Sequence, residues 1–213
     1  MVRPPRRGDG AVVGEVVVKR LGTVDYLPTL EAMQEFTSSR NADTADEIWM
    51  LQHPPVYTYG LAGKTEHLPS KTEFPVIKVD RGGQVTYHGP GQLVLYLLLD
   101  LRRSGMGVKT LVGKMEQSVV DLLEHHGVKS CGKADAPGVY VGETKIASLG
   151  LRVRRGCTYH GLSLNVDMDL SPFLAINPCG YRGLEVTSAK KLGMEASPEA
   201  LGEELIVILK EKL

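Results

Sequence analysis

The sequence predicts a mixed α/β fold of the α+β type, in which helices flank a mixed β-sheet core. Three observations indicate it: short apolar or β-branched runs recur along the chain, three segments have helical periodicity, and strands do not alternate strictly with helices. The chain has 213 residues, 42% of them hydrophobic, which is enough to bury a core. We therefore expect a flexible arm at residues 1–10 and a single domain at 11–213, with a small C-terminal lobe from about 170 as an option.

The expected strands are short runs rich in Val, Ile, Leu, Tyr and Thr, which favour the pleated backbone. In chain order they are residues 12–19, 47–52, 56–60, 75–79, 93–99, 139–141, 145–149, 151–154 and 158–166. Gly142 stands between two of these runs and predicts a hairpin turn. Residues 61–74 and 171–191 show no period, so we expect loops there.

Three segments predict helices: residues 25–38, 108–126 and 199–212. The second is the clearest, because its apolar residues fall on one helical face and Gly127 follows where a left-handed C-terminal residue is common. The third follows Ser197 and Pro198, a pair typical of a helix start.

Composition excludes several classes of protein. Lys plus Arg and Asp plus Glu both number 25, so the formal net charge is zero and the basic excess of a nucleic-acid binder is missing. Three cysteines do not suggest a disulfide scaffold. The longest apolar run is too short for a membrane span, and the N-terminus lacks the apolar core of a secretion signal. We expect a cytoplasmic protein that binds neither nucleic acid nor membrane.

The stretch at residues 81–92 reads Arg-Gly-Gly-Gln-Val-Thr-Tyr-His-Gly-Pro-Gly-Gln and lies between two runs expected to be buried strands, 75–79 and 93–99. Glycine suits close backbone approach, and the polar side chains all form hydrogen bonds. The stretch is either a Gly-rich hairpin connection or a backbone cradle for a substrate, with Arg81 and His88 beside it. Its spacing matches neither a Walker loop nor a dinucleotide fingerprint.

Three residues could supply a nucleophile or a base. Cys179 lies between Pro178 and Gly180, where a thiol has room for a substrate, although free cysteines are often simply buried. Cys157, among arginines, is a second candidate thiol. Lys145 begins an apolar run, so it is either a desolvated lysine usable as a base or an exposed residue at a hairpin end.

Several motifs together resemble one known family. Residues 81–92 resemble the signature of the lipoyl(octanoyl) transferases, enzymes that move an octanoyl group from acyl carrier protein to a lysine of lipoate-dependent proteins. Residues 142–150 are similar to the lysine segment of that family, 159–166 to its second substrate segment and 176–180 to its nucleophile loop. Residues 184–188 fit the segment that follows, and all appear in the order of the family.

The resemblance implies a fold related to the catalytic domains of biotin and lipoate protein ligases. It implies Cys179 as the nucleophile, Lys145 as the base, octanoyl-acyl carrier protein as the donor, and no cofactor or metal. The implied acceptors are lipoyl domains and the glycine cleavage H protein. Backbone N–H groups around Leu149, Gly150 and Cys179 are candidates for an oxyanion hole. The implied substrate-binding residues are Arg81, Gly82, Gly83, Gln84, Val85, Thr86, Tyr87, His88, Ser148, Leu149, Gly150, His160, Gly161, Leu162 and Ser163.

Two other functions remain open at this stage. An ATP-dependent lipoate or biotin ligase of the same superfamily would give Cys179 no nucleophilic task. A zinc-stabilised binding module would use Cys157, His160 and Cys179, with His88 as a further ligand, but their spacing matches no well-defined zinc pattern.

Five arginines could form a basic rim for an acidic acyl carrier protein, or they could be scattered surface charges. These are Arg102, Arg103, Arg152, Arg154 and Arg155.

Overall fold

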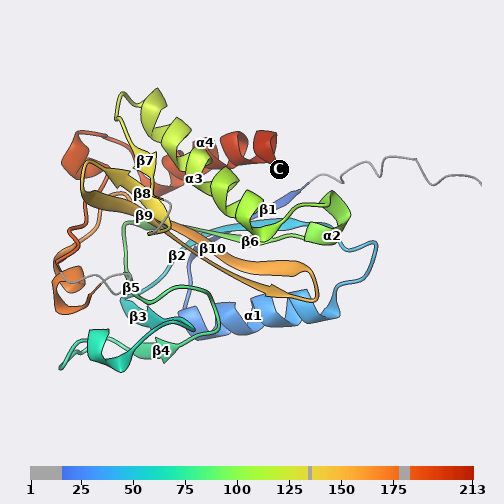
Figure 1. Ribbon diagram of the computed structural model, residues 1–213, viewed down its shortest axis with the longest axis horizontal. Coiled ribbons are helices and arrows are strands. Elements are labelled where there is room, and N and C mark those ends of the chain that lie inside the picture. Colours follow the sequence, from blue (N-terminus) through green and yellow to red (C-terminus); the bar gives the residue numbers. More distant parts are fainter. Residues whose placement is uncertain (1–15, 134–135, 178–182) are drawn as a thin grey trace, which may run out of the picture.

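The computed structural model describes residues 16–133, 136–177 and 183–213 (Figure 1). In chain order its elements are β1 (Val17–Thr23), α1 (Tyr26–Ser39), β2 (Glu47–Gln52), β3 (Val56–Tyr59), the 3₁₀ turn η1 (Thr65–His67), β4 (Val76–Lys78), β5 (Val85–His88), β6 (Gln92–Leu98), α2 (Leu101–Ser104), α3 (Val108–His125), β7 (Cys131–Gly132), β8 (Gly138–Val141), β9 (Thr144–Arg154), β10 (Cys157–Asn165), the 3₁₀ turns η2 (Ser171–Ala175) and η4 (Lys190–Leu192), and α4 (Pro198–Lys212).

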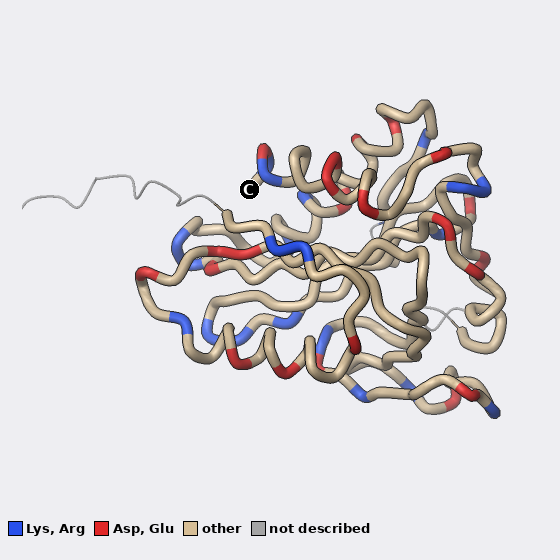
Figure 2. Tube along the Cα trace, turned by 180° about the vertical axis from the view of Figure 1, so that it is seen from behind, with Lys and Arg blue, Asp and Glu red and all other residues tan. Residues whose placement is uncertain are grey.

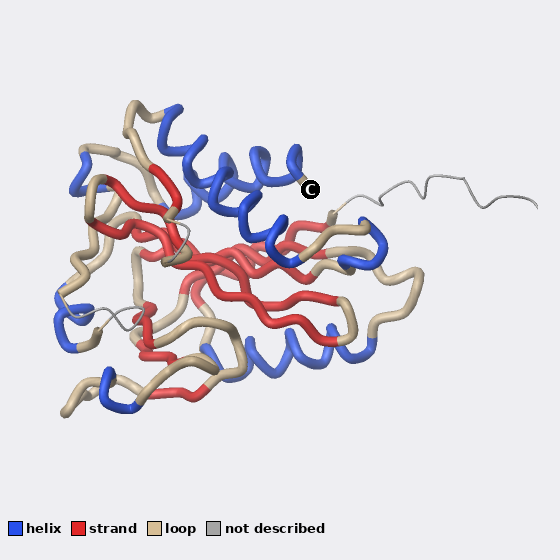
Figure 3. The backbone as a smooth tube through the Cα atoms, in the orientation of Figure 1, coloured by secondary structure: helices blue, strands red, loops and turns tan. Residues whose placement is uncertain are grey.

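A seven-stranded sheet with strand order β1-β2-β6-β10-β9-β8-β7 forms the centre of the molecule. β1 and β2 are parallel, because α1 connects them and returns the chain to the same end of the sheet. The remaining neighbours pair antiparallel. Helices lie on both faces, with α1 on one side and α3 and α4 on the other (Figures 1 and 3).

β6 shows why the apolar run at 93–99 has no polar alternation. Successive side chains of a strand point to opposite faces. Leu93, Leu95 and Leu97 pack into the core under α3 and α4, while Val94 and Tyr96 pack with α1. Both faces of the central strand are therefore buried, as the sequence predicted.

A three-stranded sheet of order β4-β3-β5 lies beside the start of α1 (Figure 1). This sheet corrects two expectations from the sequence, one for residues 75–79 and one for residues 81–92. The run at 75–79 is not a buried strand, because β4 is an edge strand with exposed Val76 and Lys78. The stretch at 81–92 is not a simple connection, because β5 pairs with β3. The polar alternation of Val85–His88 fits a strand, but the flanking glycines concealed it.

The helices α3 and α4 agree closely with the segments that the sequence predicted. α3 ends at His125 and Gly127 adopts φ 75°, the left-handed conformation expected after its end. The Ser197 hydroxyl accepts a hydrogen bond from the Ala200 N–H and caps α4. Among the described residues, no helix is both long and apolar enough to cross a membrane.

The segments 145–149 and 151–154 belong to one strand, the 11-residue β9. Arg155 and Gly156 form the turn to β10 with φ 51° and 80°. The first predicted strand is shifted, since β1 begins at Val17 and residues 12–15 lie outside the described part of the chain. α2 and β7 were not expected, because elements of four and two residues carry no periodic signal.

Candidate active site

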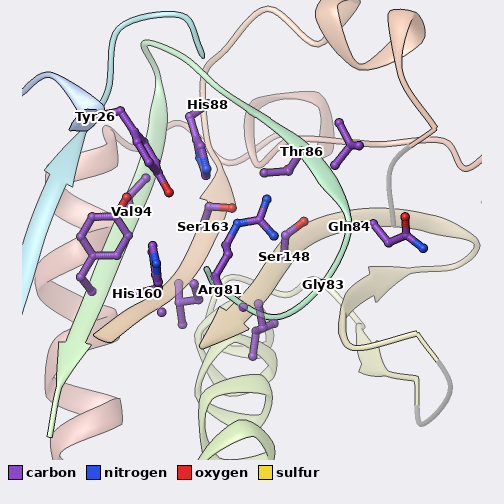
Figure 4. Close-up of a pocket in the computed structure, with 16 residues that line it drawn as sticks. Tyr26, Arg81, Gly83, Gln84, Thr86, His88, Val94, Ser148, His160 and Ser163 are labelled. Carbon is purple, nitrogen blue, oxygen red and sulfur yellow. The ribbon is translucent and has the colours of Figure 1, made fainter. Parts of the chain in front are cut away.

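A pocket with a cavity volume of about 50 Å³ lies between the segment before β5 and the middle of β9 and β10 (Figure 4). All the substrate-binding residues expected from the sequence line it except two. Those that line it are Arg81, Gly83, Gln84, Val85, Thr86, His88, Ser148, Leu149, Gly150, His160, Gly161, Leu162 and Ser163. Three segments far apart in the sequence therefore meet at one place.

The two exceptions have structural reasons. Gly82 lines a second cavity of about 380 Å³, here called the outer groove, which lies on the other side of the 81–84 segment. Tyr87 lies on the face of β5 opposite to Thr86 and His88, so it packs against Tyr57 and Phe173 instead.

The pocket has an open end, the mouth, and a closed end, the floor. Residues at the mouth are exposed or half-buried: Gly83, Gln84, Ser148, Leu149 and Gly150. Residues at the floor are 1% to 5% exposed: Tyr26, Val94, Tyr96 and His160. Figure 4 shows Tyr26 and Val94 at one end and Gln84 at the other.

Sequence reasoning missed Tyr26, Val94 and Tyr96. Tyr26 is the first residue of α1, and the other two lie on β6, within an apolar run that indicates only a buried strand. No local motif marks them. They reach the pocket because α1 covers the face of the sheet to which the even-numbered residues of β6 point.

β10 is locally strained where it borders the pocket. His160 adopts φ 60°, a conformation uncommon for residues other than glycine. The next residue, Gly161, lies so close to β6 that a Cβ there would be 2.0 Å from the Leu95 carbonyl oxygen. Glycine therefore allows the backbone of β10 to pack against β6 beneath the pocket.

His160 and Tyr159, both buried, form a polar group with the half-buried Asp80. Its Nε2 lies 3.3 Å from Asp80 Oδ1, and the Tyr159 hydroxyl donates to the other oxygen of the same carboxylate. These hydrogen bonds, that from His160 first, lower the pKa of Asp80 to about 2. Burial lowers the pKa of His160. A neutral His160 that donates from Nε2 leaves Nδ1 as an acceptor, and Nδ1 has no partner within the described residues.

His88 is held from behind by Gln92. His88 Nδ1 lies 2.7 Å from Gln92 Oε1, and an amide oxygen cannot donate, so Nδ1 carries the proton. Gln92 Nε2 donates to Asn165 Oδ1, and Asn165 Nδ2 donates to the Thr187 carbonyl. Burial lowers the pKa of His88 to about 3, so the ring is neutral at neutral pH.

His53 lies beneath the floor and contacts the floor residue Tyr96. Its Nδ1 lies 2.6 Å from the Val24 carbonyl oxygen and its Nε2 lies 2.7 Å from the Tyr96 hydroxyl. Burial lowers the pKa of His53 to about 4. The imidazole rings of His53 and His88 therefore make this end of the pocket polar without adding charge at neutral pH.

Arg81 contributes a buried positive charge to the pocket wall and is only 8% exposed. One terminal nitrogen donates to the Thr58 carbonyl and to its hydroxyl, at 3.1 and 2.8 Å, and the other donates to the Gly82 carbonyl at 3.0 Å. These bonds fix the 81–84 segment that separates the pocket from the outer groove.

Lys145 is buried, at 2% exposure, so the alternative of an exposed lysine at a hairpin end is wrong. Its Nζ donates to the Pro137 carbonyl at 2.8 Å and lies 5.3 Å from the centre of the Tyr140 ring. Its backbone N–H donates to the Glu185 carbonyl, and its carbonyl accepts from the Thr187 N–H. The segment that follows the expected nucleophile loop is thus fixed against Lys145.

Cys179 lies outside the described residues. The chain before it is described up to Asn177, whose N–H donates to the His67 carbonyl. Cys157, the first residue of β10, is buried beside Arg102, and burial raises the pKa of its thiol, which does not favour an activated thiolate.

Within the described ranges, no group of three or more His, Cys, Asp or Glu side chains could hold a metal ion. The zinc hypothesis also includes Cys179, which is outside those ranges. Of its other members, His88 is engaged by Gln92, and His160 lies beside Asp80.

The arginines of the expected rim have different surroundings. Arg102 pairs with Asp100 at 2.8 Å, and Arg103 donates to the carbonyls of Ala42 and Thr44 and lies near Asp46. Arg154 and Arg155 are exposed at the β9–β10 turn, and Arg152 is half-buried. Acidic and basic residues are interspersed along the whole trace (Figure 2).

Comparison with known proteins agrees with this geometry. Residues 25–209 match the family model of the lipoyl protein ligase A/B catalytic domain. The octanoyltransferase of Dechloromonas aromatica is 60% identical over 197 residues, which cover 92% of this chain and 96% of the relative. The octanoyltransferase of Ectopseudomonas mendocina is 61% identical, with 89% and 91% covered.

Solved structures show the same fold at low sequence identity. A bipartite lipoate protein ligase from Thermoplasma acidophilum has a TM-score of 0.74 at 18% identity, with 93% of this chain and 83% of that chain covered. The biotin protein ligase of Aquifex aeolicus has a TM-score of 0.55 at 12% identity, with 94% and 69% covered. The fold expected from the motifs is confirmed. Because two octanoyltransferases match about nine tenths of the chain at 60% identity or more, the chain belongs to the octanoyltransferases, within the family of the lipoyl protein ligase A/B catalytic domain.

Proposed function

We propose that this octanoyltransferase takes the octanoyl group from octanoyl-acyl carrier protein onto Cys179 and passes it to a lysine of a lipoyl domain, with Lys145 as the base. The observation that carries the proposal is the position of Lys145. It is a buried lysine, three residues along β9 from the pocket residue Ser148, and its backbone holds the segment that follows Cys179 in sequence. Burying an ammonium group is costly, which favours a functional reason for its place.

In the first half-reaction the Cys179 thiol loses its proton to Lys145 and its sulfur attacks the thioester carbonyl carbon. A carbon–sulfur bond to Cys179 forms, the bond to the carrier sulfur breaks, and the carrier thiolate takes the proton back from Lys145. One thioester replaces another, so the step needs no ATP.

In the second half-reaction the uncharged ε-amine of the acceptor lysine attacks the Cys179 thioester. The new bond is an amide, and the Cys179 sulfur leaves as the thiol. Lys145 accepts the proton that the amine releases and supplies one to the departing sulfur. Amide formation from a thioester is downhill, so again no ATP is needed.

The backbone beside Lys145 supports stabilisation of the oxyanion that forms in both steps. β8 pairs with β9 only as far as Ser148, so β8 does not cover the backbone of Leu149 and Gly150. Both residues pair with β10 on the opposite edge of β9, and successive N–H groups of a strand point to opposite edges, so one of the two faces the edge that β8 leaves uncovered. We assign that N–H, with the N–H of Cys179, to the oxyanion hole, where donors aimed at developing charge lower the barrier.

The pocket is assigned to the octanoyl chain, with the carbonyl at the mouth and the methyl end toward the floor. Val85, Leu149 and Leu162 supply apolar wall. The cavity of about 50 Å³ is smaller than the roughly 300 Å³ of a typical ligand site. Gln84 and Leu149, the half-buried side chains at the mouth, would therefore have to move to admit the chain.

One substitution tests whether Lys145 acts as a base or only as a fixed positive charge. Lys145→Arg keeps a positive charge but cannot release a proton in the working pH range. If Lys145 is a base, single-turnover transfer from octanoyl-enzyme to a lipoyl domain should fall by about 10²- to 10⁴-fold, the usual contribution of general-base catalysis. A folded Lys145→Arg protein within a few-fold of wild type in both half-reactions would refute the assignment.

Absence of an ATP requirement is the second test, because the superfamily also contains ligases that activate a free acid. Purified protein, octanoyl-acyl carrier protein and a lipoyl domain should give the octanoylated domain without nucleotide. Product that forms only when ATP and free octanoate are supplied would instead support the ligase mechanism.

A further inference from the structure

The outer groove, with a volume of about 380 Å³, has no role in the mechanism above. It lies between the first turns of α3, which present Val108 and Val112, and the 136–137 and 149–151 segments, which present Pro137 and Leu151. Val108 is 41% exposed, so its side chain adds apolar surface to the groove. The volume is within the roughly 300–1,000 Å³ of small-molecule sites.

The outer groove and the acyl pocket are neighbours that share a wall. Gly83, Gln84, Leu149 and Gly150 line both. The Gly82 N–H donates to the Leu151 carbonyl at 2.9 Å and ties the 81–84 segment across β9 at this boundary. A thioester carbonyl at the pocket mouth would therefore have the acyl chain on one side and the outer groove on the other.

Lys145 connects the groove to the reacting atoms. Its Nζ donates to the carbonyl of Pro137, and Pro137 lines the groove. A thiol that leaves along the groove would pass the group that the proposed mechanism assigns to its reprotonation.

The start of α3 borders the groove through Val108 and favours an anion. α3 is an 18-residue helix whose N-cap, Gly107, makes no side-chain hydrogen bond, and its first turn contains no acidic residue. The N–H groups at such a helix start carry partial positive charge and bind phosphate. Lys109 is exposed in the same turn and makes no ion pair with any residue that the structure describes.

We propose that the outer groove binds the phosphopantetheine arm of the thioester donor, with the arm along Val108, Val112 and Leu151 and its phosphate near the start of α3 and Lys109. This inference rests on the proposed function. The acceptor is the other chain that must reach the carbonyl, but a lysine side chain is short and carries no phosphate. The size, the apolar walls and the positive start of α3 together favour the arm.

The test compares donors of increasing length: S-octanoyl-N-acetylcysteamine, octanoyl-pantetheine, octanoyl-phosphopantetheine and octanoyl-acyl carrier protein. Val112→Trp fills the groove from the helix surface, and Gln117→Trp places the same ring on an exposed position of α3 outside it. We measure octanoyl-enzyme formation with each donor, and transfer from preformed octanoyl-enzyme to a lipoyl domain.

Val112→Trp should raise the KM for the three arm-bearing donors by about tenfold, equivalent to about 1.4 kcal/mol of binding. It should leave the N-acetylcysteamine thioester and the second half-reaction unchanged, and Gln117→Trp should behave as wild type. Lys109→Glu should remove any preference for octanoyl-phosphopantetheine over octanoyl-pantetheine. The unchanged reaction of the short donor also shows that each variant is folded.

Three results would overturn the proposal. An equal loss with the short donor would assign the groove to the acyl chain, and a loss confined to the second half-reaction would assign it to the acceptor. No change with any donor would leave the groove without a substrate role. By contrast, a wild-type protein that forms no octanoyl-enzyme with any donor would contradict the proposed function itself.

Discussion

The imidazoles around the pocket are neutral because they are buried, and each is held by a defined partner. His88 is fixed by Gln92, His53 by Val24 and Tyr96, and His160 by Asp80. The pKa of His88 is about 3 and that of His53 about 4. The titration of His88 and His53 should therefore not contribute to the pH dependence of acyl transfer near neutrality.

The lowered pKa of His88 predicts a pH dependence of stability. The unfolded chain protonates this histidine below about 6.5, whereas the folded protein does not until about 3. Between these values the unfolded state binds more protons, so stability falls as pH falls, by up to about 1.4 kcal/mol per pH unit for each such group. Urea unfolding of His88→Asn from pH 6.5 to 4 should show a smaller slope than wild type. Equal slopes would mean that His88 is not held neutral.

Tyr26 predicts the limit on acyl chain length. Its ring lies at the pocket floor beside His53 and His88, at centroid distances of 4.9 and 5.7 Å. Tyr26→Ala removes that ring, so the variant should accept decanoyl and dodecanoyl donors better relative to octanoyl than wild type does.

Tyr26→Phe keeps the ring and should retain the wild-type chain-length profile. The profile is measured as the rate of acyl-enzyme formation with each donor. If Tyr26→Ala and wild type rank the donors alike, the chain does not reach this floor.

At the scale of elements, the close approach of β10 to β6 fixes one wall of the pocket. A Cβ on residue 161 would lie 2.0 Å from a backbone oxygen of β6, which cannot move without disturbing the sheet. Gly161→Ala should therefore destabilise the protein by about 3 kcal/mol, at the upper end of overpacking effects. Chemical denaturation measures the change.

Gly113 provides the matched control. It lies exposed in α3, and a Cβ added there would meet no other atom within 4 Å, so Gly113→Ala should stabilise by about 0.5–1 kcal/mol through helix propensity. Similar small effects of both substitutions would show that β10 is free to shift away from β6.

Elements with strong periodicity could be predicted, and those without it could not. α3 and α4 were identified from their apolar faces and end signals, and β2 and β6 from unbroken apolar runs. β5 was missed because four residues between glycines carry too little pattern. The edge position of β4 depends on sheet order, which no local property of residues 75–79 encodes.

The residues of the candidate site fall into two similar groups: those that a sequence motif marks, and those that only packing brings to the pocket. Residues within motifs, such as Arg81 and His160, were identified because the resemblance supplied them, and the structure brings them to one pocket. Tyr26 and Tyr96 carry no motif, and only the packing of α1 against β6 brings them there. The burial of Lys145 could not be decided from sequence, since a lysine at a strand start is compatible with either state.

At the scale of the molecule, charge is balanced and dispersed, with a formal net charge of zero. Arg102 and Arg103 are partly neutralised by Asp100 and Asp46. This leaves Arg154 and Arg155 as the exposed arginines of the expected rim that form no ion pair within the described residues. An acidic acyl carrier protein would be steered by unpaired charges over a screening length of about 8 Å at physiological salt.

The KM for octanoyl-acyl carrier protein should therefore rise with salt, and Arg154→Ala with Arg155→Ala should reduce that rise. The matched pair Arg102→Ala and Arg103→Ala should reduce it less. A KM that stays flat from low to high salt would exclude a docking role for these arginines.

The chain is an enzyme of octanoyl transfer in lipoate biosynthesis, and the central claim about its mechanism is that the octanoyl group is held by Cys179 between donor and acceptor. Intact-mass spectrometry after incubation with octanoyl-acyl carrier protein, without ATP or acceptor, tests this directly. Wild type and Cys131→Ala should each gain one octanoyl group, and Cys179→Ala should gain none. An octanoyl adduct on Cys179→Ala, or none on a wild-type protein that still transfers octanoyl to a lipoyl domain, would contradict the claim.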